Sequence, residues 1–353
     1  MTPTTKSSAG NFFEDFRVGQ VLRHATPRTI TSGDVAVYTA LYGTRFAPQS
    51  SDEFARALGF PRAPVDDLLV FHVVFGKSVP DISLNAIANL GYAECVFHAA
   101  VFPGDTLSAT SQVIGVRQSS AGDRGIVYVR TTGTNQHGAK VIDYARWLMV
   151  HKRDPDSPAP VPVVPALAER VDPKTLGKAV PPIPPKAWDQ AAAGSPWTFA
   201  DYQPGERIDH LAGATIEEAE HQMATRLYQN TARVHFNAHA AASSRTGRRL
   251  IYGGVVMSIA RALSFNGLGC AFHIAAINGG RHAAPCTAGD TVYATSEILE
   301  CSAIPGRSDI GALRARLTAT TVAPRLPTTP SNQESAAPTT VLELDAWLIV
   351  PRA

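Results

Sequence analysis

The sequence predicts an α+β protein that contains two copies of one unit, each with a buried helix and an antiparallel sheet. Three observations support this prediction. The chain has 353 residues, more than one hydrophobic core usually serves, so two domains are expected. It repeats itself at a constant offset, with the same order of helical and strand-like segments in each repeat. Its composition, 44% apolar and 18% charged, is typical of a globular protein and too apolar for a disordered one.

The repeat appears when the sequence is aligned with itself. Identical residues stand 186 positions apart in four pairs, which are Phe13 and Phe199, Gly19 and Gly205, Thr29 and Thr215, and Tyr42 and Tyr228. The register slips by one where Gly104-Asp105-Thr106 matches Gly289-Asp290-Thr291. Trp147-Leu148 matches Trp347-Leu348 at a much larger offset, so we expect an insertion in the second copy, in the proline-rich stretch 324–338.

A proline-rich segment separates the two copies. Residues 155–196 hold eleven of the 26 prolines, a composition that disfavours the interiors of helices and sheets. We expect a semi-rigid, extended linker there. The predicted organisation is therefore a first copy over residues 11–154, a linker over 155–196 and a second copy over 197–353.

Within each copy the same elements are expected in the same order. A helix is predicted near 32–42 and near 216–228, the second opened by a capping box of Thr215 and Glu218. The segments that follow, 68–75 and 253–265, are too uniformly apolar for surface helices and should be buried. Antiparallel strand pairs are predicted over 125–134 with 141–151 and over 313–322 with 341–350. A buried helix wrapped by such a sheet is the hot-dog arrangement, and two copies make a tandem, or double, hot dog.

Charge and cysteine usage exclude several classes of function. The net charge is +2, with 32 basic and 30 acidic residues dispersed along the chain, so neither nucleic acid nor an anionic membrane is an expected partner. No segment reaches the roughly 18 apolar residues that a membrane span needs. Four cysteines without CxxC spacing predict reduced thiols in a cytoplasmic protein, with no disulfide framework and no metal site: Cys95, Cys270, Cys286 and Cys301.

The loop after the first helix of the second copy, residues 228–237, holds the candidate catalytic groups. His235 is suited to act as a general base near neutral pH, and Asn230 stands five residues before it. At the aligned positions the first copy has Thr44 and Gln49, since 44 and 49 plus 186 give 230 and 235. Neither of these residues titrates near neutrality. We therefore expect a catalytically silent first copy and one active site per chain.

The start of the second buried helix is the other candidate. Gly253 and Gly254 leave backbone N–H groups uncovered at a helix N-terminus, which suits a thioester oxygen that becomes enolate-like. The first copy carries Asp66-Asp67 there, and their carboxylates would repel such an oxygen. Again only the second copy fits.

The loop 228–237 resembles the hydratase motif of the MaoC-type enoyl-CoA hydratases, Gly-Asp-x-Asn-Pro-x-His, whose Asp and His hold the catalytic water. Here Asn230 replaces the Asp, and Ala232-Arg233 replaces the Asn-Pro pair. Over 11–351 the chain is also similar to the mesaconyl-CoA hydratase family, most clearly in four stretches: 38–43, 68–77, 79–86 and 224–237. This resemblance implies reversible hydration of mesaconyl-C1-CoA to β-methylmalyl-CoA with no metal or redox cofactor. It also implies that Asn230 and a degenerate first copy are normal for the family.

Two questions follow from the resemblance. The substrate has a free carboxylate, so a cation is expected in its pocket, and the candidates are Arg233, Arg281 and His282. Because an amide cannot deliver a proton, either His235 makes both proton transfers or a group of the preceding helix makes one. Those groups are Glu217, Glu218, Glu220 and His221, although His221 is expected to be solvated.

Other functions compatible with the sequence are an (R)-specific hydratase of other acyl-CoA substrates, an acyl-CoA thioesterase and a non-catalytic acyl-CoA binding protein. An acyl-CoA thioester is the expected partner in each case. Hot-dog folds usually pair, so a homo-oligomer is expected as well.

Overall fold

The structure, a computed structural model, describes residues 6–243, 246–321 and 338–352. Within these residues ten strands form one continuous sheet in the order β1-β3-β4-β5-β2-β7-β10-β9-β8-β6, and every pair of neighbouring strands is antiparallel. All but the last residue of the predicted insertion at 324–338 lie outside the described residues. No helix in the described part of the chain is long and apolar enough to cross a membrane.

The first copy follows the predicted order. The helix expected over 32–42 is confirmed as α1, because Thr31 accepts a hydrogen bond from the Asp34 N–H while the Asp34 carboxylate accepts one from the Thr31 N–H. Gly43 ends it in a left-handed conformation, φ 63°. The helices are η1 (Phe13–Asp15), α1 (Ser32–Tyr42), α2 (Ala47–Ser50), α3 (Asp52–Ala57), α4 (Asp67–Ser78) and η2 (Val79–Ser83). The strands are β1 (Val21–Thr29), β2 (Ala86–Phe97), β3 (Thr106–Gln118), β4 (Arg124–Thr134) and β5 (Lys140–His151).

The second copy repeats this order, which confirms the tandem fold. Strand β6 lies 186 positions after β1 and has the same alternation of buried and exposed residues. The helices are η4 (Phe199–Asp201), α6 (Glu218–Leu227), α7 (Arg233–Phe236), α8 (Ala238–Ala242), α9 (Gly253–Leu263) and α10 (Phe265–Leu268). The strands are β6 (Arg207–Thr215), β7 (His273–Arg281), β8 (Thr291–Ile304), β9 (Arg307–Thr320) and β10 (Thr340–Pro351).

One local prediction in this copy is wrong. Thr215 does not cap α6, because it is the last residue of β6 and its hydroxyl pairs with that of Thr291 across the sheet. Glu217 occupies the N-cap position instead, without a side-chain cap, and the carboxylate of Glu218 is bound by Arg249. The two residues of the predicted capping box therefore have other roles: Thr215 pairs across the sheet and Glu218 forms an ion pair.

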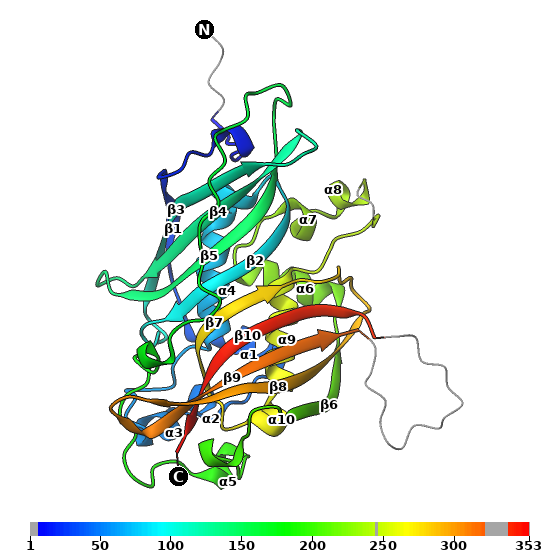
Figure 1. The fold of residues 1–353 in the computed structure, drawn as a ribbon. Coiled ribbons are helices and arrows are strands. Elements are labelled where there is room, and N and C mark those ends of the chain that lie inside the picture. The colour runs from blue at the N-terminus through cyan, green and yellow to red at the C-terminus, as the bar shows by residue number, and fades with distance from the viewer. Residues whose placement is uncertain (1–5, 244–245, 322–337, 353) are drawn as a thin grey trace.

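The long helices α4 and α9 lie together on one face of the sheet, as Figure 1 shows. Where the two copies meet, His72 Nε2 lies 3.0 Å from Ser258 Oγ, and the Tyr228 hydroxyl donates to that of Tyr42 at 2.8 Å. The partners in each pair are 186 positions apart. Equivalent positions that touch must lie near a shared axis, so an approximate twofold axis relates the copies.

The sheet continues across this axis through strands β2 and β7, the only pairing in the described chain that joins strands of different copies. Tyr92 is paired with Gly280 and Val96 with Ala276. This seam places residues of β2 and β5 next to the segment that follows β7. It is therefore what allows one cavity to be built from both copies.

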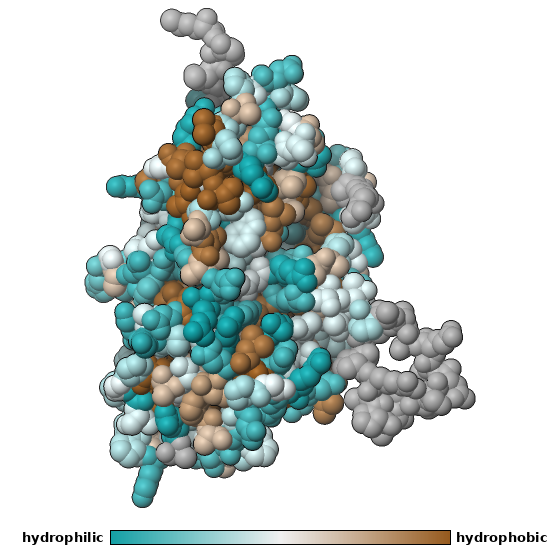
Figure 2. All heavy atoms as spheres, viewed as in Figure 1, coloured by the Kyte–Doolittle hydropathy of each residue, from teal (hydrophilic) through white to brown (hydrophobic). Residues whose placement is uncertain are grey.

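The linker packs against the outer face of the sheet and crosses it from the first copy to the second (Figure 1). Val163 bridges to Val116 of β3, the Val171 N–H donates to Asn278 at 2.8 Å, and Trp347 donates to the Val171 carbonyl at 3.1 Å. It includes only short helices, η3 (Pro173–Thr175) and α5 (Gln190–Ala193), in the described structure. Figure 2 shows apolar surface gathered on the upper part of this face, over the first copy.

Candidate active site

A cavity of about 270 Å³ lies where the two copies meet, and residues of both line it. Such a volume is at the small end for ligand sites and suits a short acyl chain. The first copy contributes Phe75, Val79, Ser83, Ala86, Ile87, Ala88, Asn89, Tyr92, Arg146 and Leu148. The second contributes Asn230, Ala232, Val234, His235, residues 250–253, Val256, residues 282–286 and Val341. Most of these side chains are apolar, so the few polar groups decide what the cavity can do.

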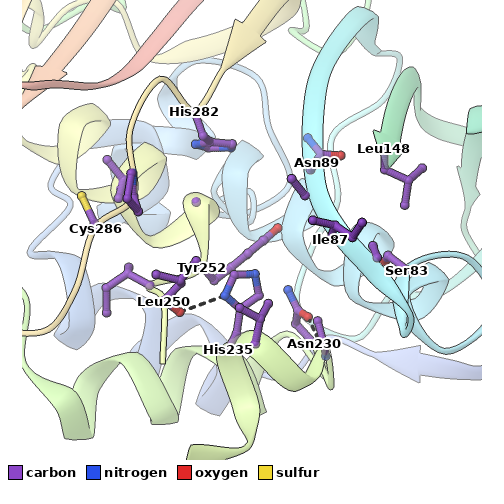
Figure 3. Close-up of a pocket in the computed structure, with 18 of the residues that line it drawn as sticks. Ser83, Ile87, Asn89, Leu148, Asn230, His235, Leu250, Tyr252, His282 and Cys286 are labelled. Carbon is purple, nitrogen blue, oxygen red and sulfur yellow. Dashed lines mark hydrogen bonds between the residues drawn. The ribbon is translucent and has the colours of Figure 1, made fainter. Parts of the chain in front are cut away.

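His235 is presented to the cavity by the single helical turn α7. The His235 N–H donates to the Ala232 carbonyl at 3.0 Å, which closes this turn directly after the loop. The Nδ1 of His235 is 2.9 Å from the Leu250 carbonyl oxygen. Since a carbonyl can only accept, Nδ1 carries the proton and Nε2 keeps a free lone pair. In Figure 3 the ring lies beside Tyr252 with its second nitrogen on the cavity side.

The environment of His235 keeps the imidazole neutral. Burial lowers its pKa below the ordinary value of 6.5, and the hydrogen bond to Leu250 opposes this shift only in part. Nε2 is therefore available as a base at neutral pH. This is the protonation state that activation of a water molecule requires.

Asn230 is buried and lies on the same wall as His235 (Figure 3). Its Oδ1 accepts a hydrogen bond from the Ala232 N–H at 3.2 Å, so the side chain helps to shape the loop. This bond also orients the amide, and Nδ2 has no hydrogen-bond partner among the described residues. These contacts are compatible with two roles, a cap for the loop and a group that orients a water molecule.

Helix α9 begins at the cavity with two glycines that the packing requires. A Cβ on Gly253 would lie 2.2 Å from the His282 ring, and one on Gly254 would lie 2.5 Å from the His72 ring. The backbone N–H groups of these glycines have no partner in the described part of the chain, while the Tyr252 N–H is bound by His221 Nε2 at 3.0 Å. Gly253 lines the cavity, so the helix start presents the uncovered Gly253 N–H there, and the N–H of Gly254 follows it in the first turn.

His221 corrects another expectation, since it is fully buried rather than solvated. Its ring is 6.3 Å from that of His235, centroid to centroid, and burial followed by the neighbouring His235 lowers its pKa to about 3. It does not line the cavity, and its Nε2 is occupied by the Tyr252 N–H. His221 thus fixes the start of α9.

The glutamates of the preceding helix point away from the cavity. Glu218 pairs with Arg249, and Glu217 and Glu220 are exposed. None of the described residues that line the cavity is Asp or Glu. Of the proton donors left open by the sequence, the structure brings none from this helix into the site.

The aligned site of the first copy is filled. Gln49 donates to the carbonyl of Phe272 at 2.8 Å, and the Thr44 hydroxyl donates to Asp66 at 3.4 Å. Asp67 accepts hydrogen bonds from two groups at the start of β7. The void that remains there measures about 10 Å³, which is too small for a substrate.

The two predicted arginines do not reach the cavity. Arg281 is exposed at the end of β7 and pairs with Glu343, and Arg233 is exposed and donates to Asn85 at 3.3 Å. Both placements correct the sequence-based candidates for carboxylate binding.

His282, the third candidate, does line the cavity (Figure 3). Its Nε2 is hydrogen-bonded to the Tyr92 hydroxyl at 3.2 Å across the seam between the copies. Burial, with a smaller contribution from His235, lowers its pKa to about 4. A neutral imidazole offers a weaker partner for a carboxylate than a cation would.

Sequence reasoning missed Arg146 and Asn89, both from the first copy. Arg146 is fully buried in β5, and Asn89 stands on β2 beside it. The one available signal was an arginine inside the apolar strand 141–151, where the second copy has Ala346 in the alignment that pairs the tryptophans. The buried Arg146 has no counterpart in the second copy, so it does not belong to the core that the two copies share.

Comparison with solved structures defines the class of the protein. The chain superimposes on a MaoC domain protein dehydratase from Chloroflexus aurantiacus with a TM-score of 0.94, at 57% identity over 99% of this chain and 100% of that one. A Mycobacterium tuberculosis protein described as a double hot dog matches with a TM-score of 0.74 at 24% identity, over 98% and 99% of the two chains, and supports the fold alone. The chain is a double hot-dog protein of the MaoC-like dehydratase class.

The sequence comparisons then give the family. The chain belongs to the mesaconyl-CoA hydratase family, whose model matches residues 3–323. It is 58% identical to β-methylmalyl-CoA dehydratase of Chloroflexus aurantiacus over 351 residues, 99% of each chain. It is also 53% identical to mesaconyl-CoA hydratase of Cereibacter sphaeroides, over 98% of this chain and 100% of that one.

Proposed function

We propose that this protein is a hydro-lyase that adds water reversibly to an enoyl-CoA thioester, with mesaconyl-C1-CoA and β-methylmalyl-CoA as the physiological pair. The observation that carries the proposal is the placement of a neutral His235, Nε2 free, in the same cavity as the uncovered N-terminus of α9. The two relatives above, similar over nearly their whole length, are named for these two compounds.

The reaction needs a base and an oxyanion site. His235 Nε2 takes a proton from water as the water oxygen bonds to the β-carbon, the carbon that bears the carboxylate. The electron pair of the double bond moves toward the thioester, whose oxygen becomes enolate-like and accepts hydrogen bonds from the Gly253 and Gly254 N–H groups. Asn230 Nδ2 donates to the water oxygen and fixes its position.

The second proton transfer falls to the same histidine. The imidazolium formed in the first step gives its proton to the α-carbon next to the thioester, which regenerates neutral His235. This assignment is supported by the absence of Asp and Glu from the described lining. In the reverse direction His235 removes the α-proton and returns it to the leaving hydroxyl.

The two copies divide the work in this proposal. The second copy, residues 197–353, supplies the reacting groups, while the first, residues 11–154, supplies a wall of the cavity and the other half of the core. The filled site around Gln49 supports one active site per chain. The linker 155–196 holds the arrangement from outside.

The proposed setting is a cytoplasmic homo-oligomer. The cytoplasmic location is supported by the cysteines, because thiols stay reduced in that compartment. All four are free, and three of them are buried: Cys95, Cys270 and Cys286, with Cys301 partly exposed. Light scattering on the purified protein would measure its oligomeric state.

The alternatives make different predictions. An acyl-CoA thioesterase would need a carboxylate near the thioester carbonyl, which no described lining residue supplies. A non-catalytic binding protein would bind without turnover. An (R)-specific hydratase of other substrates would prefer crotonyl-CoA to mesaconyl-CoA.

The test is a turnover panel of mesaconyl-CoA and crotonyl-CoA, followed by absorbance of the conjugated double bond and by a free-thiol assay. We expect loss of absorbance with mesaconyl-CoA and no thiol release. His235→Gln should lower kcat by about 1,000-fold, within the range of general acid–base catalysis. His239→Gln, at an exposed position of α8, is the matched control and should retain full activity. Thiol release, or turnover unaffected by His235→Gln, would disprove the assignment.

A further inference from the structure

We propose that Arg146 and Asn89 form a carboxylate-recognition subsite, which makes the enzyme select acyl-CoA thioesters with a free carboxylate on the β-carbon. The inference rests on the proposed hydratase function and specifies which part of the substrate the first copy binds. It gives the catalytically silent copy a direct contact with substrate.

The first argument is the uncompensated charge of Arg146. A buried guanidinium costs several kcal/mol unless it is paired and fully hydrogen-bonded. Arg146 is fully buried, yet it forms no ion pair with any described residue. Its guanidinium stacks over the Phe75 ring at 4.1 Å and donates to the Ser78 hydroxyl at 2.9 Å. Nε and Nη1 have no partner in the described structure, although both are buried.

A second buried arginine shows how this fold treats a structural one. Arg261 stacks over Phe46 at 3.8 Å, and its pKa, lowered to about 10 by burial, is raised in part by the carboxylates of Asp66 and Asp67. Burial also lowers the pKa of Arg146, but the groups that oppose the shift are tyrosine hydroxyls, and no carboxylate is among them. Arg146 thus lacks the anion that Arg261 has.

Asn89 supplies the second part of the subsite. Strands β2 and β5 are paired so that Asn89 stands opposite Leu148 and Tyr92 opposite Arg146. Both the Oδ1 and the Nδ2 of Asn89 are buried without a partner among the described residues. Leaving such atoms unsatisfied costs about 1–3 kcal/mol each. Asn89 and Arg146 line the same cavity, and Figure 3 shows Asn89 on the β2 side of it.

The charge of the subsite suits the chemistry of the proposed substrate. A carboxylate accepts two parallel hydrogen bonds from an arginine, and Nε with one Nη is a common pairing. The carboxylate of mesaconyl-C1-CoA is bonded to the carbon that water attacks, so it repels an incoming oxygen with negative character. A cation at this end offsets that repulsion, while the thioester oxygen is held at Gly253 and Gly254 in the other copy.

The experiment measures binding of two saturated thioesters that cannot be hydrated. One is 2-methylsuccinyl-CoA with its thioester beside the methyl group, and the other is 2-methylbutanoyl-CoA, in which a methyl replaces the carboxylate. We expect calorimetry on the wild-type protein to give about 10- to 100-fold tighter binding of the dicarboxylic ligand, the range for hydrogen bonds to a charged group. Arg146→Met should abolish this preference and bind the methyl ligand at least as well as wild type, which also reports correct folding.

Two further variants keep the test decisive. Asn89→Leu should reduce the preference about 10-fold, the loss of one hydrogen bond to a charged group. Arg281→Gln removes one positive charge from the exposed end of β7 and should leave the preference unchanged. If Arg146→Met does not fold, the wild-type ratio and the Asn89→Leu ratio still decide the question.

The outcomes separate this inference from the hydratase function. Equal binding of both ligands by wild type, or an equal loss for both in Arg146→Met, would overturn the subsite and leave the hydratase proposal untouched. A strong preference for the dicarboxylic ligand without any turnover of mesaconyl-CoA would support the subsite and contradict the hydratase function.

Discussion

Replacing Gly253 with alanine tests the oxyanion site directly. The added Cβ would lie 2.2 Å from Cε1, 2.4 Å from Nε2 and 2.5 Å from Nδ1 of His282. Ordinary contact begins near 3.4 Å, so the ring would have to retreat by about 1.2 Å. The ring is held at 3.2 Å by its hydrogen bond to the Tyr92 hydroxyl, which opposes such a movement. The start of α9 should shift instead and move its N–H groups away from the thioester oxygen.

We expect Gly253→Ala to lower kcat by about 100- to 1,000-fold, the usual effect of losing an oxyanion donor, with a smaller change in KM. The assay is the change in absorbance of mesaconyl-CoA, with thermal unfolding as a check on the fold. Gly279→Ala, in the adjoining strand β7, is the matched control, since its Cβ would meet nothing closer than 3.8 Å. A Gly253→Ala enzyme that keeps more than one-tenth of the wild-type kcat would refute the role of this helix start.

Two other predictions concern pH and the first copy. Because burial lowers the pKa of His235, the neutral base persists as the pH falls below 6.5, so the acid limb of kcat/KM should lie below that value; a limb at or above 6.5 contradicts the neutral, buried base. Gln49→Ala removes the hydrogen bond to Phe272 and should cost about 1 kcal/mol of unfolding free energy, measured with urea, while kcat stays within twofold. A tenfold loss of kcat in this variant would show that the first copy takes part in the chemistry.

Local sequence patterns predicted helices and strands well where the patterned residues act on their own segment of backbone, as caps or turns. Helix α1 begins and ends where its capping residues and Gly43 indicate, and β4 and β5 pair around the turn at 135–138 as expected. The capping-box prediction at Thr215 was wrong, because its hydroxyl is hydrogen-bonded to Thr291 in the neighbouring strand β8. The expectation that His221 is solvated was also wrong. Its acidic neighbours in the sequence do not show that this face of α6 packs under Tyr252.

The sequence by itself determined the duplication, the tandem fold and the positions of His235, Asn230 and the two glycines of α9. These features depend on residues close together in one copy, and alignment of the copies reveals where they differ. Only the tertiary structure decided that Arg146 and Asn89 line the same cavity and that Arg233 and Arg281 do not. The reason is physical: the cavity forms where β2 meets β7, and pairing between strands so far apart in the chain depends on how the two copies dock.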